Sequence, residues 1–247
     1  TVDDEYTGGA GNSLGSWLAR FNFDCEEWEF SFYADHFFED HSAMLFMDYD
    51  GYGQGSEWNV KKKRRYFLYA LKDIQLGFEI RFLDAPWLNK FLFEYLYSKY
   101  QSGPVYHDHD EVVSDHLGGQ DNYYNHSLYT GWQHWGQVIG NPLFLSPLYN
   151  TDQSIEVKNN RSESYHFGFC GDPLPGLHYR FLGTYLKGYG TYDTPYSEPR
   201  STFSMLAEAT YSFASTSRFK GWSMRGALGM DFGKLMGNNY GLQLTIA

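Results

Sequence analysis

The chain of 247 residues lacks any run of about 18 apolar residues, which is the length that a transmembrane helix requires. A helical membrane protein is therefore excluded. Its two cysteines are too few for a disulfide framework and fit no metal-binding spacing. It has no stripe of Lys and Arg, and its net charge of −11 argues against nucleic acid as a partner. It also lacks an initiator Met and a signal peptide, so we expect a mature form or part of a longer chain.

Aromatic residues and glycine are abundant. The chain holds 22 Tyr, 20 Phe and 26 Gly but only 8 Pro, a composition that suits strands and turns better than helices. The mean hydropathy of −0.53 is typical of a soluble protein. In a membrane β-barrel, however, each polar residue facing the lumen offsets an apolar residue facing lipid, so mean hydropathy does not separate the two classes.

Several segments alternate apolar and polar residues with a period of two, which predicts strands with different surroundings on their two faces. Soluble sandwiches also alternate. Segments of nine to eleven residues are nevertheless the length that a tilted strand needs to cross a bilayer. Aromatic residues that favour the membrane interface stand at or beside strand ends: Trp17, Trp28, Trp87, Trp222 and Tyr240. We expect ten strands, near 17–23, 28–37, 42–48, 72–82, 88–97, 161–169, 177–186, 202–213, 222–232 and 240–247.

The connections between these strands differ in length on the two sides. If the last strand descends to the periplasm, the periplasmic connections are short: 214–221, 170–176, 83–87 and 38–41. The external connections include the three longest: 49–71, 98–160 and 187–201. This asymmetry is typical of bacterial outer-membrane barrels. The sequence therefore predicts an all-β fold, a transmembrane antiparallel up-and-down β-barrel, with residues 1–247 as one barrel domain and 98–160 as a long external loop.

The same topology separates the two cysteines. It assigns Cys25 to an external turn and Cys170 to a periplasmic one, on opposite sides of an apolar band about 25 Å tall. That separation exceeds the reach of a disulfide, so we expect both to be free thiols.

Segment 98–160 is too long for an ordinary loop and too aromatic for a disordered one. Aromatic rings mixed with Asn, Asp, Gln and His side chains are what sugar rings require, because apolar ring faces stack and hydroxyls need planar hydrogen-bond partners. A loop that packs on itself would show the same composition. The polysaccharide-binding candidates are Tyr106, His107, His109, Tyr123, Tyr124, His126, Trp132, His134 and Trp135.

Other clusters have both a functional and an ordinary interpretation. His107, His109 and His116, with neighbouring aspartates, have the side chains of a metal site, but such residues are also typical of a solvated loop. The basic run 61–65 could contact lipopolysaccharide phosphates or form a solvated turn. No nucleophile motif or phosphate-binding loop is present, so no catalytic residue and no cofactor is expected.

Charged residues on one face of the alternating segments carry both signs. They could line a water channel or form salt-bridge ladders across a narrow interior. The main candidates for lumen-facing charges are Glu79, Arg81, Arg180, Glu208 and Arg225.

Six segments resemble the Wzi capsule-assembly family of Bacteroides-type bacteria. They are 32–42, 101–109, 121–126, 129–137, 140–143 and 237–246, which include Tyr-His-Asp-His at 106–109 and Gly-Trp-Gln-His-Trp-Gly at 131–136. The resemblance implies an outer-membrane barrel of about eighteen strands that retains or assembles surface polysaccharide. Because only about ten strands are expected here, this chain would form part of such a barrel.

We therefore expect a non-enzymatic protein of the bacterial outer membrane that binds surface polysaccharide through its external loops. The expected partners are that polysaccharide and outer-membrane lipid, including lipopolysaccharide, but not nucleic acid. One alternative is a porin or transporter for small solutes, and another is a soluble β-rich carbohydrate-active enzyme. Channel conductance and glycan cleavage distinguish these alternatives.

Overall fold

The structure is a computed structural model. It describes residues 14–39, 47–48, 53, 55–60, 65–66, 71–105, 110–112, 119–126 and 131–247. Within these ranges, no helix has the length and apolar character needed to cross a membrane.

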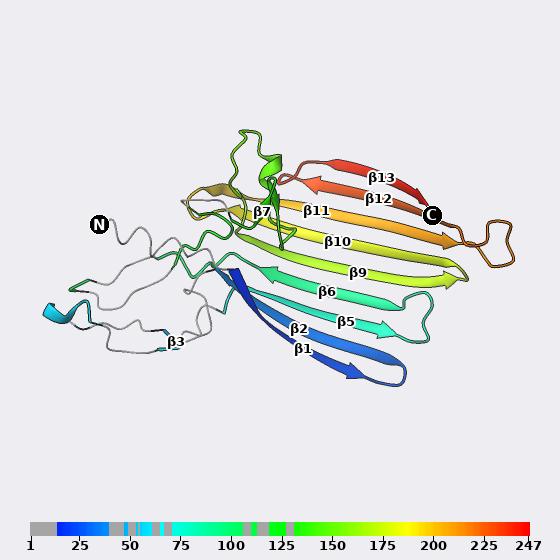
Figure 1. Cartoon of the computed structure of the whole chain (residues 1–247), viewed down its shortest axis with the longest axis horizontal. Helices are drawn as coiled ribbons and strands as arrows, with labels where there is room; N and C mark the ends of the chain where they lie inside the picture. The colour runs from blue at the N-terminus through cyan, green and yellow to red at the C-terminus, as the bar shows by residue number, and fades with distance from the viewer. Residues whose placement is uncertain are drawn as a thin grey trace.

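Nine antiparallel strands form one sheet in the described part of the chain, and each strand pairs with the next long strand along the sequence. Figure 1 shows them as a single layer. In sheet order the strands are β1 (Leu14–Asp24), β2 (Trp28–Glu39), β5 (Ile74–Phe82), β6 (Lys90–Tyr97), β9 (Ser162–Leu174), β10 (Leu177–Gly190), β11 (Pro195–Ser212), β12 (Ser223–Gly233) and β13 (Asn239–Ile246).

Six short elements lie in the connections. Four are two-residue strands, which pair into two hairpins, and two are single 3₁₀ turns. The hairpins pair β3 (Met47–Asp48) with β4 (Arg65–Tyr66) and β7 (Gln133–His134) with β8 (Gln137–Val138). The 3₁₀ turns are η2 (Gly55–Glu57) and η3 (Pro147–Tyr149).

The pairing register separates the alternating side chains into two faces, because residues paired across neighbouring strands point to the same side. One face, which we call the apolar face, contains a row without a polar residue across all nine strands. That row is Phe23, Phe30, Ile80, Phe91, Phe169, Phe181, Ala207, Leu228 and Leu242. The opposite, polar face contains a row with both charges and hydroxyls. That row is Arg20, Tyr33, Gly77, Glu94, His166, Thr184, Ser204, Asp231 and Asn239.

Aromatic residues border the apolar face at both ends. Near one end, Tyr95 contacts Tyr97 and Tyr165, with ring centroids 6.4 and 5.2 Å apart. Near the other end, Trp87 and Trp222 are 70% and 55% exposed. Large aliphatic and phenyl side chains fill the band between these borders. Tyr and Trp borders around an apolar band are typical of barrels that cross a membrane.

The two ends of the sheet carry different connections (Figure 1). The short-turn end holds 25–27, 83–89, 175–176 and 213–222, and the chain also ends there. The long-loop end holds 40–73, 98–161, 191–194 and 234–238. The predicted asymmetry is therefore present, but 187–201 is not a long loop. Strands β10 and β11 extend through most of it and leave a connection of residues 191–194.

The predicted strand at 42–48 is wrong as a member of the main sheet. Its described residues, Met47 and Asp48, pair only with Arg65 and Tyr66, whereas β2 pairs directly with β5. Removing this strand reverses the direction expected for everything before it. Turn 25–27 therefore lies at the short-turn end, where Leu83 N donates to Glu27 O at 3.0 Å.

This reversal corrects the prediction for the cysteines. Cys25 and Cys170 are both free thiols, as expected, with Cys25 exposed and Cys170 partly buried. The reason given from the sequence is wrong, because both lie toward the same end of the sheet. Cys25 is in the β1–β2 turn, and Cys170 O accepts from Asn89 N at the end of connection 83–89.

The sheet is open at β1 and β13 (Figure 1). Both strands run toward the short-turn end, so joining them directly would pair them in parallel. An antiparallel barrel that contains this sheet would therefore need an odd number of further strands between the two edges.

Candidate functional site

The described parts of segment 98–161 fold onto the polar face near the long-loop end and have a small core of their own. Four buried residues form this core: Tyr123, Tyr124, Phe144 and Val157, with exposed fractions of 3% or less. Leu14 and Phe37 from β1 and β2 pack against it. The ring of Tyr123 meets Phe37 edge-on at 5.9 Å between centroids, which joins the segment to the sheet.

Asp73, the residue immediately before β5, anchors this segment. Its carboxylate accepts hydrogen bonds from Tyr100 N at 2.9 Å, Gln101 N at 2.6 Å and the Tyr123 hydroxyl at 2.7 Å. Its backbone oxygen lies 2.7 Å from His36 Nδ1. The side chain is almost fully buried, and this loss of solvation raises the pKa of Asp73 despite the three donors, which act to lower it.

A second network of hydrogen bonds connects the two ends of the segment. Asn160 Nδ2 donates to Asn122 Oδ1 at 2.6 Å and to Tyr123 O at 2.8 Å. Ser98 Oγ donates to Asn160 O at 2.9 Å. Buried polar groups are costly unless they are hydrogen-bonded, so these contacts favour one conformation of the segment.

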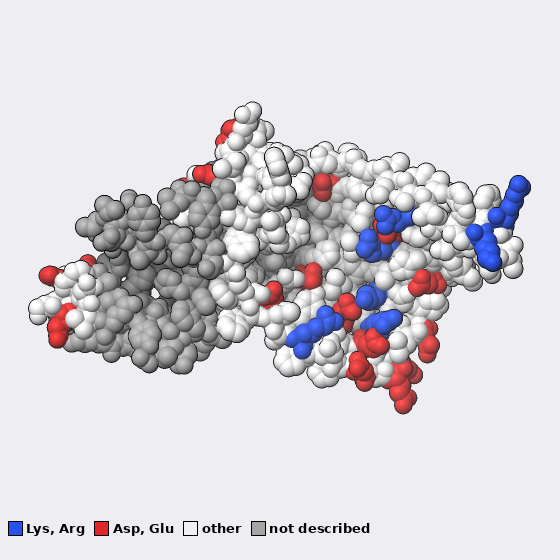
Figure 2. All heavy atoms as spheres, in the orientation of Figure 1, with Lys and Arg blue, Asp and Glu red and all other residues white. Residues whose placement is uncertain are grey.

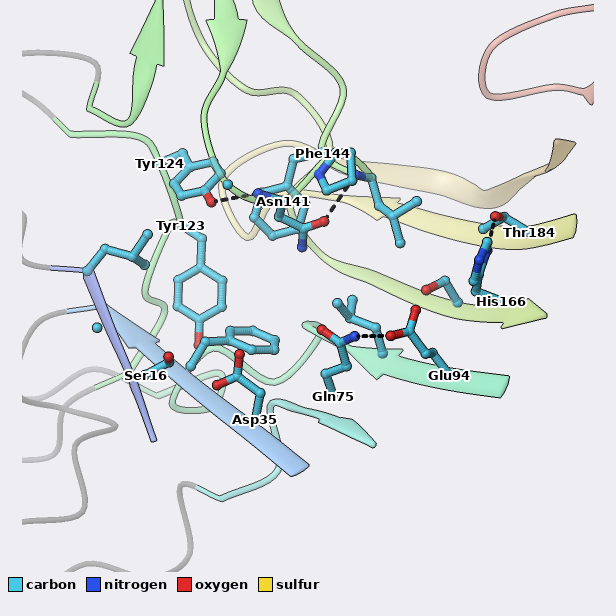
Figure 3. A pocket seen from close by; sticks show the side chains of 18 residues that line it. Ser16, Asp35, Gln75, Glu94, Tyr123, Tyr124, Asn141, Phe144, His166 and Thr184 are labelled. Atoms are coloured by element: carbon cyan, nitrogen blue, oxygen red, sulfur yellow. Dashed lines mark hydrogen bonds between the residues drawn. The ribbon is translucent and has the colours of Figure 1, made fainter. Parts of the chain in front are cut away.

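A cavity of about 670 Å³ lies between this segment and the polar face (Figure 3). We call it the loop cavity. One wall comes from the segment, with Tyr123, Tyr124 and residues 140–144. The facing wall comes from the strands and is largely polar: Ser16, Asp35, Gln75, Glu94, Ser164, His166 and Thr184.

Two hydrogen-bonded groups hold the strand wall in place. Glu94 Oε1 accepts from the Tyr33 hydroxyl at 2.5 Å and from Gln75 Nε2 at 3.0 Å. His166 Nδ1 lies 2.7 Å from Thr184 Oγ1 (Figure 3). By contrast, Asp35 Oδ1 is buried and has no hydrogen-bond partner among the described residues.

Beyond the cavity, the polar face carries ion pairs between neighbouring strands. Arg81 pairs with Glu29 at 3.3 Å, and Lys90 pairs with Glu79 at 3.2 Å. Glu208 lies between two cations: Arg180 Nη2 at 3.4 Å and Arg225 Nε at 3.8 Å. Figure 2 shows these charges gathered over the half of the sheet nearer the short turns. The five charges expected to face a lumen, Glu79, Arg81, Arg180, Glu208 and Arg225, thus share one face of the sheet.

The sugar-binding candidates separate into three groups. Tyr123 and Tyr124 lie in the core of the segment, an arrangement typical of a self-packed loop, and His126 is partly buried. Trp132, His134 and Trp135 are exposed on or beside the β7–β8 hairpin. Tyr106, His107 and His109 lie outside the described residues.

The metal candidates His107, His109 and His116 all lie outside the described residues. In the described ranges, no group of three His, Cys, Asp or Glu side chains is arranged to hold a metal ion. Of the basic run 61–65, only Arg65 is described, in β4.

Sequence reasoning named Tyr123 and Tyr124, which line the loop cavity, but missed the polar residues of its strand wall. Asp35, Gln75, His166 and Thr184 occupy polar positions of alternating segments, which was the available signal. Their common location depends on the strand register and on where segment 98–161 folds, and neither can be derived from alternation.

No protein-family model matches the chain, and no curated protein matches it. Among solved structures, OccAB4 from Acinetobacter baumannii has a TM-score of 0.45 and 12% identity, over 95% of this chain and 45% of that one. OccK10 (OpdN) from Pseudomonas aeruginosa has a TM-score of 0.46 and 11% identity, over 95% of this chain and 53% of that one. The chain thus spans about half the length of either protein, and the likeness is too low to indicate function.

Proposed function

We propose that this chain forms part of the wall of a bacterial outer-membrane β-barrel, with its apolar face toward lipid and its polar face toward a water-filled lumen. Segment 98–161 folds into that lumen and narrows it, so the barrel passes small polar solutes. The observation that carries this proposal is the separation of the single-layer sheet into one apolar and one polar face, with the folded segment covering only the polar one.

The apolar face supports contact with lipid. Its side chains are widely exposed, including Leu242 at 85%, Leu244 at 67% and Phe21 at 58%. An apolar surface of this extent is unstable against water and must be covered by lipid or protein. Along β11 the band runs from Phe203 to Tyr211, about 26 Å at the usual rise per strand residue. This is the strand length that a tilted crossing requires.

The polar face supports an aqueous lumen that is locally constricted. Ion pairs between strands leave charges of both signs in contact with solvent, as in water-filled barrels. The loop cavity has a volume within the range of small-molecule sites. It is formed by a segment with its own core and buried anchors, so the narrowing is built into the fold.

The strand directions are consistent with a larger barrel. The eighteen strands implied by the Wzi resemblance would require nine more than the sheet contains. Nine is an odd number, as antiparallel closure demands.

Single-channel recording in planar bilayers tests the pore. We expect discrete conductance steps from the unmodified protein. Replacing residues 132–146 with a short Gly-Ser linker should increase the conductance, because it removes one wall of the loop cavity. The same replacement in 214–219, at the short-turn end, is the control and should leave conductance unchanged. Absence of conductance from protein that shows heat-modifiable gel mobility would refute the pore.

A second candidate function is non-enzymatic attachment of surface polysaccharide, the role implied by the Wzi resemblance. It is favoured by exposed aromatic residues on the hairpin at the long-loop end. Trp135 is 87% exposed, Trp132 is 38% exposed, and the His134 and Trp135 ring centroids are 6.1 Å apart. Exposed tryptophan faces can stack on sugar rings.

A glycan-binding assay tests whether the β7–β8 hairpin binds polysaccharide. We expect capsular polysaccharide to bind the unmodified protein and to bind the Trp132→Ala, Trp135→Ala double variant much less. Trp87→Ala removes an equally prominent tryptophan at the opposite end of the sheet and should bind normally. Equal binding by all three proteins would exclude the hairpin as the polysaccharide site.

A further inference from the structure

The loop cavity has an electrostatic character that the pore proposal does not specify. Its lining includes two carboxylates, Asp35 and Glu94, and no Lys or Arg among the described residues. This differs from the rest of the polar face, where Glu29, Glu79 and Glu208 each have a cationic partner within 4 Å. The loop cavity therefore holds two carboxylates of that face that lack such a partner among the described residues.

The two carboxylates differ in how they are held. Glu94 is fixed by donors from Tyr33 and Gln75, which are neutral. The Arg20 guanidinium lies 5.6 Å from the centre of the Tyr33 ring and donates to Asn22 and Ser31. Asp35 has a buried oxygen that no described donor satisfies. Asp35 lines the cavity, so an ammonium group bound there would balance its charge.

The remaining walls define the rest of the ligand. Leu96, Leu143 and Phe144 give apolar surface, and His166 with Thr184 gives polar atoms on the side away from Asp35 (Figure 3). Asp35 and Glu94 stand on β2 and β6, separated by β5 and offset by two residues along the strands, so their backbones are about 12 Å apart. This spacing fits a short chain with amino groups at separate positions.

We propose that the loop cavity binds small organic cations carrying ammonium groups, with Asp35 and Glu94 as the specificity-determining residues. This inference deepens the proposed pore function and rests on it for its physiological meaning. A cavity lined by one sign of charge concentrates the opposite ion, and acidic rings select cations in channels. The pore would accordingly favour cations over anions.

Binding of spermidine to the detergent-solubilised protein tests the cavity without requiring conductance. Isothermal titration in about 0.1 M salt limits nonspecific attraction to the net negative surface. We expect the unmodified protein to bind spermidine and not glutarate, a dianion. The Asp35→Asn, Glu94→Gln double variant should bind it about tenfold more weakly or not at all, because both substitutions keep the side-chain size and remove the charge.

A matched control removes two negative charges elsewhere. Glu26 and Glu27 lie in the β1–β2 turn at the opposite end of the sheet, and the Glu26→Gln, Glu27→Gln variant should bind spermidine normally. Heat-modifiable mobility verifies that each variant is folded. No binding by the unmodified protein, or equal loss in both double variants, overturns the inference.

Reversal potentials across a potassium chloride gradient provide the second readout. We expect a potassium preference of about tenfold that falls toward unity in the Asp35→Asn, Glu94→Gln variant and persists in the control. Conductance with no such preference overturns the selectivity while leaving the pore intact. Charge-dependent spermidine binding without conductance would refute the pore and support the cavity as a cation site.

Discussion

Leu242→Arg on β13 tests whether lipid covers the apolar face. The side chain is 85% exposed, so its replacement removes few contacts within the protein. In water such a surface change alters the free energy of unfolding by about 0.5 kcal/mol or less. Leu242 lies in the same row as Ala207, which is midway between Phe203 and Tyr211 on β11. An arginine near the bilayer midplane costs about 2–4 kcal/mol, which is roughly a 30- to 1,000-fold change in the unfolding equilibrium.

The assay is denaturant unfolding of the protein refolded into phospholipid vesicles, followed by tryptophan fluorescence. Gln243→Arg is the matched control, since it adds the same side chain to the adjacent residue on the polar face of the same edge strand. We expect Leu242→Arg to be destabilised by at least about 2 kcal/mol relative to Gln243→Arg. Equal stability of the two variants would refute a lipid-facing apolar face.

Three further predictions concern the connections. Asp73→Ala removes an acceptor of three hydrogen bonds and should destabilise docking of segment 98–161 by about 3 kcal/mol or more. Faster amide hydrogen exchange in 98–105 and 119–126 would detect this loss, and unchanged exchange would contradict the role of Asp73 as an anchor. The Lys158 ammonium, 2.5 Å from the Asp152 carboxylate, lowers the pKa of Asp152 to about 2, so this ion pair should persist until the pH falls through that value. Lys158→Ala should return the pKa toward 3.8, as measured by NMR titration, and an unchanged value would exclude Lys158 as the cause. A membrane-impermeant maleimide added to the side of vesicles that labels Cys25 should also label Cys170, more slowly because it is partly buried; labelling from opposite sides would contradict the revised strand directions.

The sequence predicted the sheet well where alternation was long and uninterrupted. The segments that became β5, β11, β12 and β13 show the clearest alternation, and each forms a strand of the main sheet. The segment at 42–48 was also predicted to be a strand of this sheet, but its described residues, Met47 and Asp48, pair outside it. Composition could not reveal this, because membership in the sheet depends on which strand lies beside β2.

Loop lengths were informative only when the strand boundaries were right. Segment 98–160 was correctly expected to be long and folded, and its core of Tyr123, Tyr124 and Phe144 uses the aromatic residues that suggested this. The sequence also predicts a loop at residues 187–201. They continue the hairpin of β10 and β11, because backbone pairing can extend a strand where the side chains no longer alternate.

The sequence by itself determined that the chain forms two-faced strands, because side chains alternate with a period of two whatever the neighbours of a strand are. It also determined which residues share a face within each strand. Only the tertiary structure decided the strand order, the end at which each turn lies and the position of segment 98–161. These depend on strand register and on contacts between distant residues, such as the hydrogen bond from Tyr123 to Asp73. They also bring Asp35 into the lining of the loop cavity. For that reason the loop cavity, with its two carboxylates, could be recognised only after the chain was folded.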